Sequence, residues 1–157
     1  MLKIEEYKLF HNSQDFDGLI LKSKDFINNN EVDYENFITN IYAKAKKSNS
    51  ALILYKNNIP IGYELAVIAN RTVCHSFTYI IPTERNKKYS YILREKMIEI
   101  LIDKVDKYIT VIKKNNISSI KGLNKILNKY PCEFSIEKVI SKSGEIYEKY
   151  TITKRPD

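Results

Sequence analysis

The chain has 157 residues, of which 43% are hydrophobic and 29% are charged, and its formal net charge is +7 at pH 7. This length suits one domain with its own core, and this composition excludes a disordered chain. Lys carries most of the positive charge, which argues against a dedicated reader of DNA bases because such proteins favour the Arg fork. The charge would still attract an anionic ligand or a polyanion such as RNA.

Cys74 and Cys132 are the two cysteines, and neither lies in a C-x-x-C pair or beside clustered His. We therefore expect no metal site and two reduced thiols, as in a cytoplasmic protein. The first residues, MLKIEEYKLFHNSQ, carry charges every few positions, and no stretch is as long and apolar as a membrane span. The sequence predicts a soluble, cytoplasmic protein that does not associate with membranes.

The N-terminal half is predicted to contain a strand, two helices and two further strands. Residues 2–10 alternate well enough for a short strand, and Ser13 and Asp33 are candidate N-caps of the helices. The helices place apolar residues on one stripe each: Phe16, Leu19, Ile20, Phe26 and Ile27 in the first, and Tyr34, Phe37, Ile38, Ile41, Tyr42 and Ala45 in the second. Residues 51–55 and 61–69 then read as strands of an antiparallel meander.

The central stretch is an apolar strand at 73–81, a polar basic turn at 82–90 and an amphipathic helix. The helix places Tyr89, Leu93, Met97, Ile100, Leu101 and Val105 on one face. Its first N–H groups have no intrahelical partners and face the turn, so together with Arg85, Lys87 and Lys88 they would suit a phosphate or pyrophosphate. The alternative is a solvated, Lys-rich connection.

The C-terminal part is predicted to be a strand at 108–112, a helix and a closing hairpin. The strand is expected to run parallel to 73–81, because a helix connects the two. Asn115 and Asn116 can cap the next helix, whose apolar stripe is Ile117, Ile120, Leu123, Ile126, Leu127 and Tyr130. Residues 134–140 and 146–153 form the hairpin, so the element order is β, α, α, β, β, β, α, β, α, β, β within one domain, residues 1–157.

This order and the central stretch resemble the GNAT superfamily of acyl-CoA-dependent N-acetyltransferases over nearly the whole chain. In that family a strand ending in a V-x-P-like signature enters an R/Q-x-x-G-x-G/A turn, and residues 80–85 match the first part. Lys88 and Ser90 stand where the family has two small residues. The resemblance implies an α+β fold: a mainly antiparallel sheet of about seven strands flanked by about four helices. It also implies a V-shaped gap between the strand ending at Ile81 and the strand 108–112.

The resemblance further implies that acetyl-CoA is the co-substrate. The backbone of Tyr79, Ile80 and Ile81 would pair with the pantetheine arm as an extra strand. The cofactor would also contact the turn and the start of the next helix, at Arg85, Asn86, Lys87, Lys88, Tyr89, Ser90 and Asn116. A plain N-cap explains Asn116 equally well.

Transfer to an amine needs a base, and His75 and Glu64 are the candidates. His75 lies on the strand that precedes the turn, and imidazole is a side chain suited to act as a base near neutral pH, whereas Glu64 interrupts an apolar strand. The family often has a Tyr as general acid where Leu123 stands here; Tyr130 is the nearest Tyr in sequence, although it falls on the apolar stripe. The first reading is an N-acetyltransferase acting on a primary amine in a ternary complex. The alternative is a degenerate, non-catalytic binding or assembly module, and a homodimer is left open.

Overall fold

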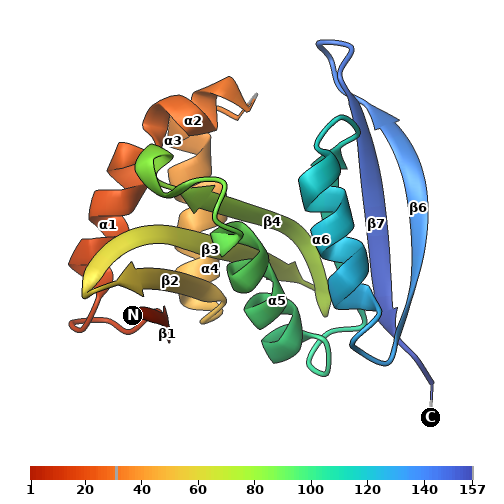
Figure 1. Ribbon diagram of the computed structural model, residues 1–157, viewed down its shortest axis with the longest axis horizontal. Coiled ribbons are helices and arrows are strands. Elements are labelled where there is room, and N and C mark those ends of the chain that lie inside the picture. Colours follow the sequence, from red (N-terminus) through yellow and green to blue (C-terminus); the bar gives the residue numbers. More distant parts are fainter. Residues whose placement is uncertain (31, 157) are drawn as a thin grey trace.

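A computed structural model describes residues 1–30 and 32–156. Within them, seven strands form one sheet in the order β1-β2-β3-β4-β5-β7-β6 (Figure 1). The strands are β1 (Leu2–Glu6), β2 (Ala51–Lys56), β3 (Ile59–Ala69), β4 (Thr72–Ile80), β5 (Lys107–Lys113), β6 (Cys132–Ile140) and β7 (Ile146–Lys154). Neighbouring strands are antiparallel except β4 and β5, which are parallel. The predicted α+β fold and mainly antiparallel sheet are confirmed.

Helices cover both faces of this sheet. They are α1 (Ser13–Lys22), α2 (Lys24–Asn29), α3 (Tyr34–Phe37), a π-helical turn η1 (Ile38–Tyr42), α4 (Ala43–Lys47), a 3₁₀ turn η2 (Pro82–Glu84), α5 (Tyr89–Leu101) and α6 (Ile117–Leu127). One core cluster joins α1 to α4 to the sheet, and the other joins α5 and α6 to the opposite face. None of the helices in the described ranges is long and apolar enough to span a membrane.

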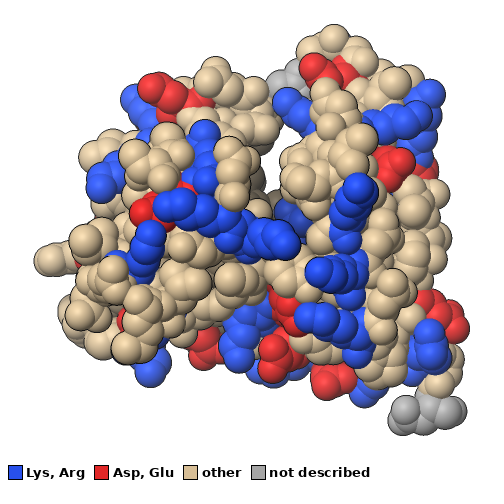
Figure 2. Space-filling model, in the orientation of Figure 1, with Lys and Arg blue, Asp and Glu red and all other residues tan. Residues whose placement is uncertain are grey.

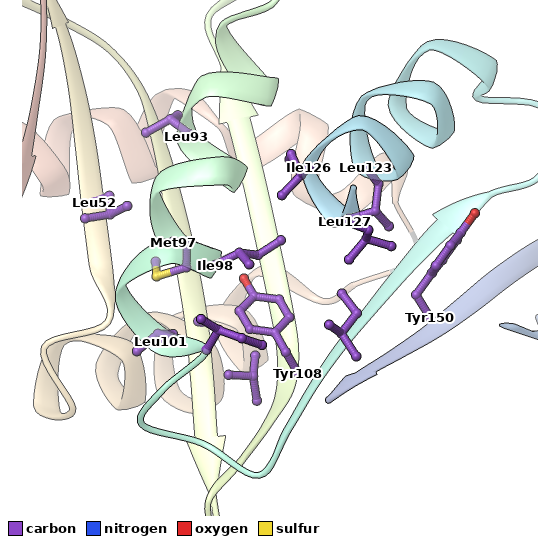
Figure 3. Packing of buried hydrophobic residues seen from close by; sticks show 14 of the residues in the cluster. Leu52, Leu93, Met97, Ile98, Leu101, Tyr108, Leu123, Ile126, Leu127 and Tyr150 are labelled. Carbon is purple, nitrogen blue, oxygen red and sulfur yellow. The ribbon is translucent and has the colours of Figure 1, made fainter. Parts of the chain in front are cut away.

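The core cluster on the α5 and α6 side packs these two helices against the sheet. Leu93, Met97 and Ile98 project from α5 toward the sheet, and Leu123 and Ile126 project from α6 (Figure 3). Tyr108 of β5 is fully buried in this cluster, and its ring lies between the two helices (Figure 3). The three-and-four spacing read from the sequence therefore gives most of the buried face of each helix. It missed the buried Ile98 of α5, and Ile117, which it placed on the apolar stripe of α6, is 60% exposed.

The predicted boundaries need three corrections in the N-terminal half. β1 ends at Glu6 instead of residue 10, because the Asn12 side chain bonds the Lys8 N–H and the Glu6 carbonyl, both at 2.9 Å, and folds the chain into a loop. Asn12 rather than Ser13 is the N-cap residue of α1. The first helical segment is broken at Ser23, whose hydroxyl donates to the Ile20 carbonyl at 2.8 Å and lies 2.8 Å from the Tyr63 hydroxyl.

The second helical segment, at 34–47, is helical throughout but contains the π turn η1. Its predicted cap is confirmed, since the Asp33 side chain accepts from the Asn36 N–H at 3.0 Å. The prediction that α5 extends to Val105 is wrong. The chain turns after Leu101 so that Asp106 can donate its N–H to the Arg71 carbonyl at 2.6 Å and enter β5, while Val105 stays in the core.

The strands β4 and β5 are paired only where they begin. The register joins Thr72 to Lys107 and Val73 to Tyr108, and among the described residues the pairing of the two strands stops there. β5 instead pairs with β7 from Tyr108 to Lys113. The predicted V-shaped gap is confirmed, and it leaves one edge of β4 open toward α6.

We predict that Gly62→Ala weakens the fold beside this gap. A Cβ on Gly62 would lie 2.6 Å from the Tyr79 carbonyl oxygen and 2.5 Å from Ile80 Cδ1, so the end of β4 would have to move. The free energy of unfolding in urea should fall by about 1–3 kcal/mol. Gly18→Ala in α1 is the control: nothing lies within 4 Å of its Cβ, and it should raise stability by about 0.5–1 kcal/mol. Equal stability of Gly62→Ala and wild type would contradict this close approach.

Candidate active site

A cleft of about 1060 Å³ lies between the end of β4, the start of α5 and α6. Thr78 and Ile80 line it from β4, and Phe26 lines it from α2. The opposite wall is the polar face of α6, with Ser118, Lys121, Gly122 and Lys125, and it continues to Asn128, the C-cap residue of the helix. A cleft of this size is large enough for a nucleotide-sized ligand.

The start of α5 presents free backbone donors to the cleft. The first intrahelical bond runs from the Ile92 N–H to the Lys88 carbonyl, and the helix has no side-chain cap. The N–H groups of Tyr89, Ser90 and Tyr91 therefore precede the hydrogen-bonded ladder at the positive end of the helix dipole. Lys88 adopts the left-handed conformation with φ 66°, which places it in the region that Gly occupies most easily.

The cleft is strongly basic. Figure 2 shows Lys and Arg side chains on both sides of the hollow that separates the two halves of the molecule. The cationic residues lining the cleft are Arg85, Lys88, Arg94, Lys121 and Lys125. Glu84 also lines it, but its carboxylate is paired with Lys56 at 3.1 Å and with Lys87 at 2.9 Å. The hydrogen bonds from Lys87 and Lys56 lower the pKa of Glu84. The site as a whole suits a polyanion.

The open edge of β4 offers backbone groups at alternate residues. The Ile81 N–H donates to the Ile61 carbonyl of β3 at 2.9 Å, so residue 81, and by alternation residue 79, direct their backbone groups toward β3. Ile80 and Thr78 therefore direct theirs into the gap. Of the three residues expected to pair with a pantetheine arm, Ile80 directs its backbone groups into the gap. Tyr79 and Ile81 do not, because their backbone groups face β3.

Arg85 lies on this open edge. Its Nε donates to the Ile80 carbonyl at 2.9 Å, and its guanidinium lies 5.2 Å from the Phe26 ring centre and 5.8 Å from that of Tyr79. Arg85 thus lines the cleft with its charge held against two aromatic rings. The other turn residues divide: Asn86, Lys88, Tyr89 and Ser90 line the cleft, and Lys87 is held by Glu84.

Glu64 is a carboxyl group buried behind the cleft wall. It is 1% exposed, and its Oε2 accepts a hydrogen bond from the Thr78 hydroxyl on the neighbouring strand. Its Oε1 has no partner among the described residues. Burial raises the pKa of Glu64 to about 7, against the opposing effects of the Arg94 charge and the Thr78 hydrogen bond. A carboxylate with this pKa is suited to accept a proton near neutral pH.

Two further groups surround this carboxyl. Arg94 reaches from α5 across the cleft, where its Nη1 donates to the Ser119 carbonyl of α6 at 3.4 Å. Tyr108 of β5 is fully buried, and its hydroxyl, like Glu64 Oε1, has no partner among the described residues. Burial and the Glu64 charge raise the pKa of Tyr108 well above its ordinary value. These groups meet where β4 and β5 separate.

The structure does not bring the other two candidate catalytic residues to the cleft. His75 is exposed and borders a second hollow, of about 580 Å³, with Asp33, Asn36 and Asn40. Tyr130 is half-buried and lies beyond the end of α6, so the prediction that it belongs to this helix is wrong. Burial and the charges of Glu95 and Glu99 raise its pKa.

Asn116 is the N-cap of α6, as one of its two predictions had it, and its place in the cleft wall leaves the predicted pantetheine contact open. Its side chain caps α6 by accepting from the Ser119 N–H at 3.3 Å, and the residue also lines the cleft. Leu123 is fully buried in the core, so α6 places no hydroxyl at that position.

Sequence reasoning missed the wall that α6 contributes. The missed lining residues are Phe26, Thr78, Tyr91, Arg94, Ser118, Ser119, Lys121, Gly122, Asn124, Lys125 and Asn128. Those on α6 recur at three-and-four spacing opposite its apolar stripe, which is the signal that could have revealed a polar helix face. Nothing in the sequence separates a polar face that borders a cleft from one that borders bulk solvent.

Three solved structures show what this arrangement is similar to. A ribosomal-protein-alanine N-acetyltransferase from Brucella melitensis shares 18% identity with a TM-score of 0.68, and the alignment covers 97% of this chain and 99% of that one. A GNAT-family acetyltransferase from Bacillus cereus shares 16% with a TM-score of 0.67, covering 100% and 99%. A putative acetyltransferase from Salmonella typhimurium, solved with its cofactor acetyl-CoA, shares 13% with a TM-score of 0.70, covering 100% and 95%.

These similarities show that the chain has the fold of the GNAT N-acetyltransferases. The resemblance read from the sequence is confirmed for the fold. Neither protein-family models nor curated proteins match the sequence. Among the described residues, no three His, Cys, Asp or Glu side chains come together in a way that could hold a metal ion.

We predict that Lys88→Gly stabilises the protein. Lys88 has φ 66°, a conformation in which a Cβ is unfavourable, so its removal should raise the free energy of unfolding by about 1 kcal/mol. Asn86→Gly is the matched control, because Asn86 has φ 65° but Asn tolerates this region better, and its gain should be smaller. Chemical denaturation measures both. A loss of stability in Lys88→Gly would show that the Lys88 side chain itself holds the turn.

We predict that Glu64 makes the protein less stable as pH rises through neutrality. Its pKa is about 7 in the folded protein and 4.5 in the unfolded chain, so between these values only the folded protein keeps the proton. This contribution is complete below pH 4.5 and lost above about pH 7, a difference of about 3 kcal/mol. The unfolding free energy of wild type minus that of Glu64→Gln should therefore fall by about this amount between pH 4.5 and pH 8. A constant gap would contradict the shifted pKa.

Proposed function

We propose that this protein is an acetyl-CoA-dependent N-acetyltransferase that passes an acetyl group to a primary amine by direct attack in a ternary complex. The observation that carries the proposal is the separation of β4 from β5, which opens a basic cleft at the start of α5 with a buried carboxyl group beside it. The fold shared with N-acetyltransferases supports it.

The cleft fits acetyl-CoA in charge and in size. The free N–H groups at the start of α5, with Lys88, would hold the pyrophosphate, while Lys121 and Lys125 would balance the remaining phosphate charge. The backbone of Thr78 and Ile80 would pair with the pantetheine arm in the gap, which requires Arg85 to share or release the Ile80 carbonyl. Asn116 would contact the arm from the opposite side. Bound acetyl-CoA supplies the thioester carbonyl that the amine attacks.

Glu64 is the base that the geometry favours over His75. The pKa of Glu64 lies near 7, its carboxyl is bonded to a residue of the cleft wall, and Arg94 supports its ionised form. His75 borders a different hollow. The acceptor must lose a proton as it attacks, and a buried carboxylate beside the gap can take it.

The alternative is a non-catalytic module with the same fold, and two observations favour it. Lys88 occupies a strained position in the phosphate turn, and Leu123 leaves α6 without the usual acid. Neither prevents transfer, because the backbone donors remain and a thiolate is a good leaving group that needs little help from an acid. Binding of RNA and formation of a homodimer stay predictions.

Titration calorimetry with acetyl-CoA tests the first half of the proposal. Wild type should bind one molecule per chain with a Kd below about 1 mM. Lys125→Glu in the cleft should weaken binding about fivefold, and Lys138→Glu on exposed β6, with the same change in net charge, should not. Release of free thiol in the presence of a panel of primary amines tests the second half. Binding without thiol release would favour the non-catalytic module; no heat at millimolar acetyl-CoA would contradict the cofactor site itself.

A further inference from the structure

The proposed base does not reach the cleft directly. Glu64 is 1% exposed and does not line the cleft. Thr78 of β4, whose side chain lies on the same face of the sheet, does line it. The two residues are direct cross-strand partners in the β3–β4 register. An acceptor amine in the cleft would therefore meet the Thr78 hydroxyl before it could meet the carboxylate.

The hydrogen bond between them has a defined direction. Glu64 in its ionised form can only accept, so the Thr78 hydroxyl donates its proton to Oε2. With that proton committed, the lone pairs of Thr78 Oγ1 remain available to accept a proton from a group in the cleft. A hydroxyl in this position can pass a proton without ever carrying a lasting charge.

We propose that Thr78 is a catalytic residue of the acetyl transfer, in which its hydroxyl contacts the acceptor amine and relays the amine proton to Glu64. This inference rests on the proposed function and goes beyond it by naming the group that touches the acceptor. The relay also limits the acceptor, because its nitrogen must reach the Thr78 hydroxyl in the cleft beside the bound thioester, which favours an unhindered primary amine.

The amine lone pair forms the C–N bond at the acetyl carbonyl carbon, the C–S bond breaks, and the electron pair leaves with sulfur as a thiolate. The amine N–H proton moves to Thr78 Oγ1 while the original Thr78 proton moves to Glu64 Oε2, so the hydroxyl is regenerated. Glu64 leaves the step protonated and is reset when the proton returns through Thr78 to the thiolate or to water.

The surroundings of Glu64 suit a group that gains and loses a proton in each cycle. Arg94 from α5 favours the ionised form, whereas burial and the unpartnered Oε1 disfavour it. Tyr108 from β5 and Tyr63 on the same strand also lie within electrostatic range, and burial raises the pKa of both, so both stay neutral. Thr78 is the hydroxyl that connects this enclosed carboxyl to the cleft.

Thr78→Val and Thr78→Ser test the relay, because Val keeps the shape and Ser keeps the hydroxyl. Thr78→Val should lower kcat about a hundredfold and leave the Kd for acetyl-CoA within about twofold, and the rise of rate with pH near the pKa of Glu64 should vanish. Thr78→Ser should keep most of the activity and the profile. Ser76→Ala is the control: Ser76 lies on the same strand with its hydroxyl 3.2 Å from Thr110 Oγ1, and its loss should change kcat less than about threefold.

Two further readouts separate a relay from a structural role. Wild-type rates in mixtures of H2O and D2O should give a curved plot, because two protons move together, and Thr78→Val should give a straight one. Without acetyl-CoA, Thr78→Val should shift the pH dependence of unfolding due to Glu64 upward, because the carboxylate loses its donor.

The relay is overturned if wild type transfers acetyl groups and Thr78→Val keeps the same kcat and pH profile. The relay is also overturned if the double variant Glu64→Gln/Thr78→Val raises the activation free energy by the sum of the two single effects. Once one part of a relay is removed, removing the other part should change kcat little further. A wild type that binds acetyl-CoA but transfers nothing to any amine overturns the proposed function instead, which the calorimetric and thiol-release measurements show separately.

Discussion

The arrangement of the whole site depends on β4 and β5 pairing at two residues and then separating. Thr72 and Val73 are bound to β5, and beyond them β4 keeps one partner, β3, so its other edge carries unpaired backbone groups. An open edge inside a sheet costs free energy unless something bonds to it. Arg85 satisfies one of these backbone groups, because its Nε donates to the Ile80 carbonyl. The gap and the basic cleft are consequences of this divergence, and the polar face of α6 forms one wall of the cleft.

The same divergence explains why a carboxyl group can be buried beside the gap. Glu64 lies on β3, a strand with core on both faces, where its ionised form is costly and its neutral form is favoured. The protein keeps it beside one hydroxyl and one arginine instead of a full ion pair. Burial of Glu64 lowers the stability of the folded protein at neutral pH and raises the pKa of the carboxyl to about 7, as expected at functional sites.

The sequence was sufficient for the elements and their order, because alternation and three-and-four spacing report burial directly. It was also sufficient for the parallel β4–α5–β5 unit and the divergence after it, through the resemblance carried by residues 80–85. It failed where tertiary contacts override local pattern: Ser23 breaks a helical stripe to meet Tyr63, and α5 stops at Leu101 so that the chain can reach β5. For the site, Glu64 and His75 could not be separated, since which hollow each residue borders depends on strand register and on helices distant in sequence.

In the proposed function, acetyl-CoA occupies the open edge of β4. Amide hydrogen exchange, followed residue by residue by NMR with and without acetyl-CoA, tests it most directly. We predict new protection at the Thr78 and Ile80 amides and at the first amides of α5, with little change at Tyr79 and Ile81, whose backbone groups already face β3. Binding that protects amides elsewhere and leaves those of Thr78 and Ile80 unchanged would contradict it.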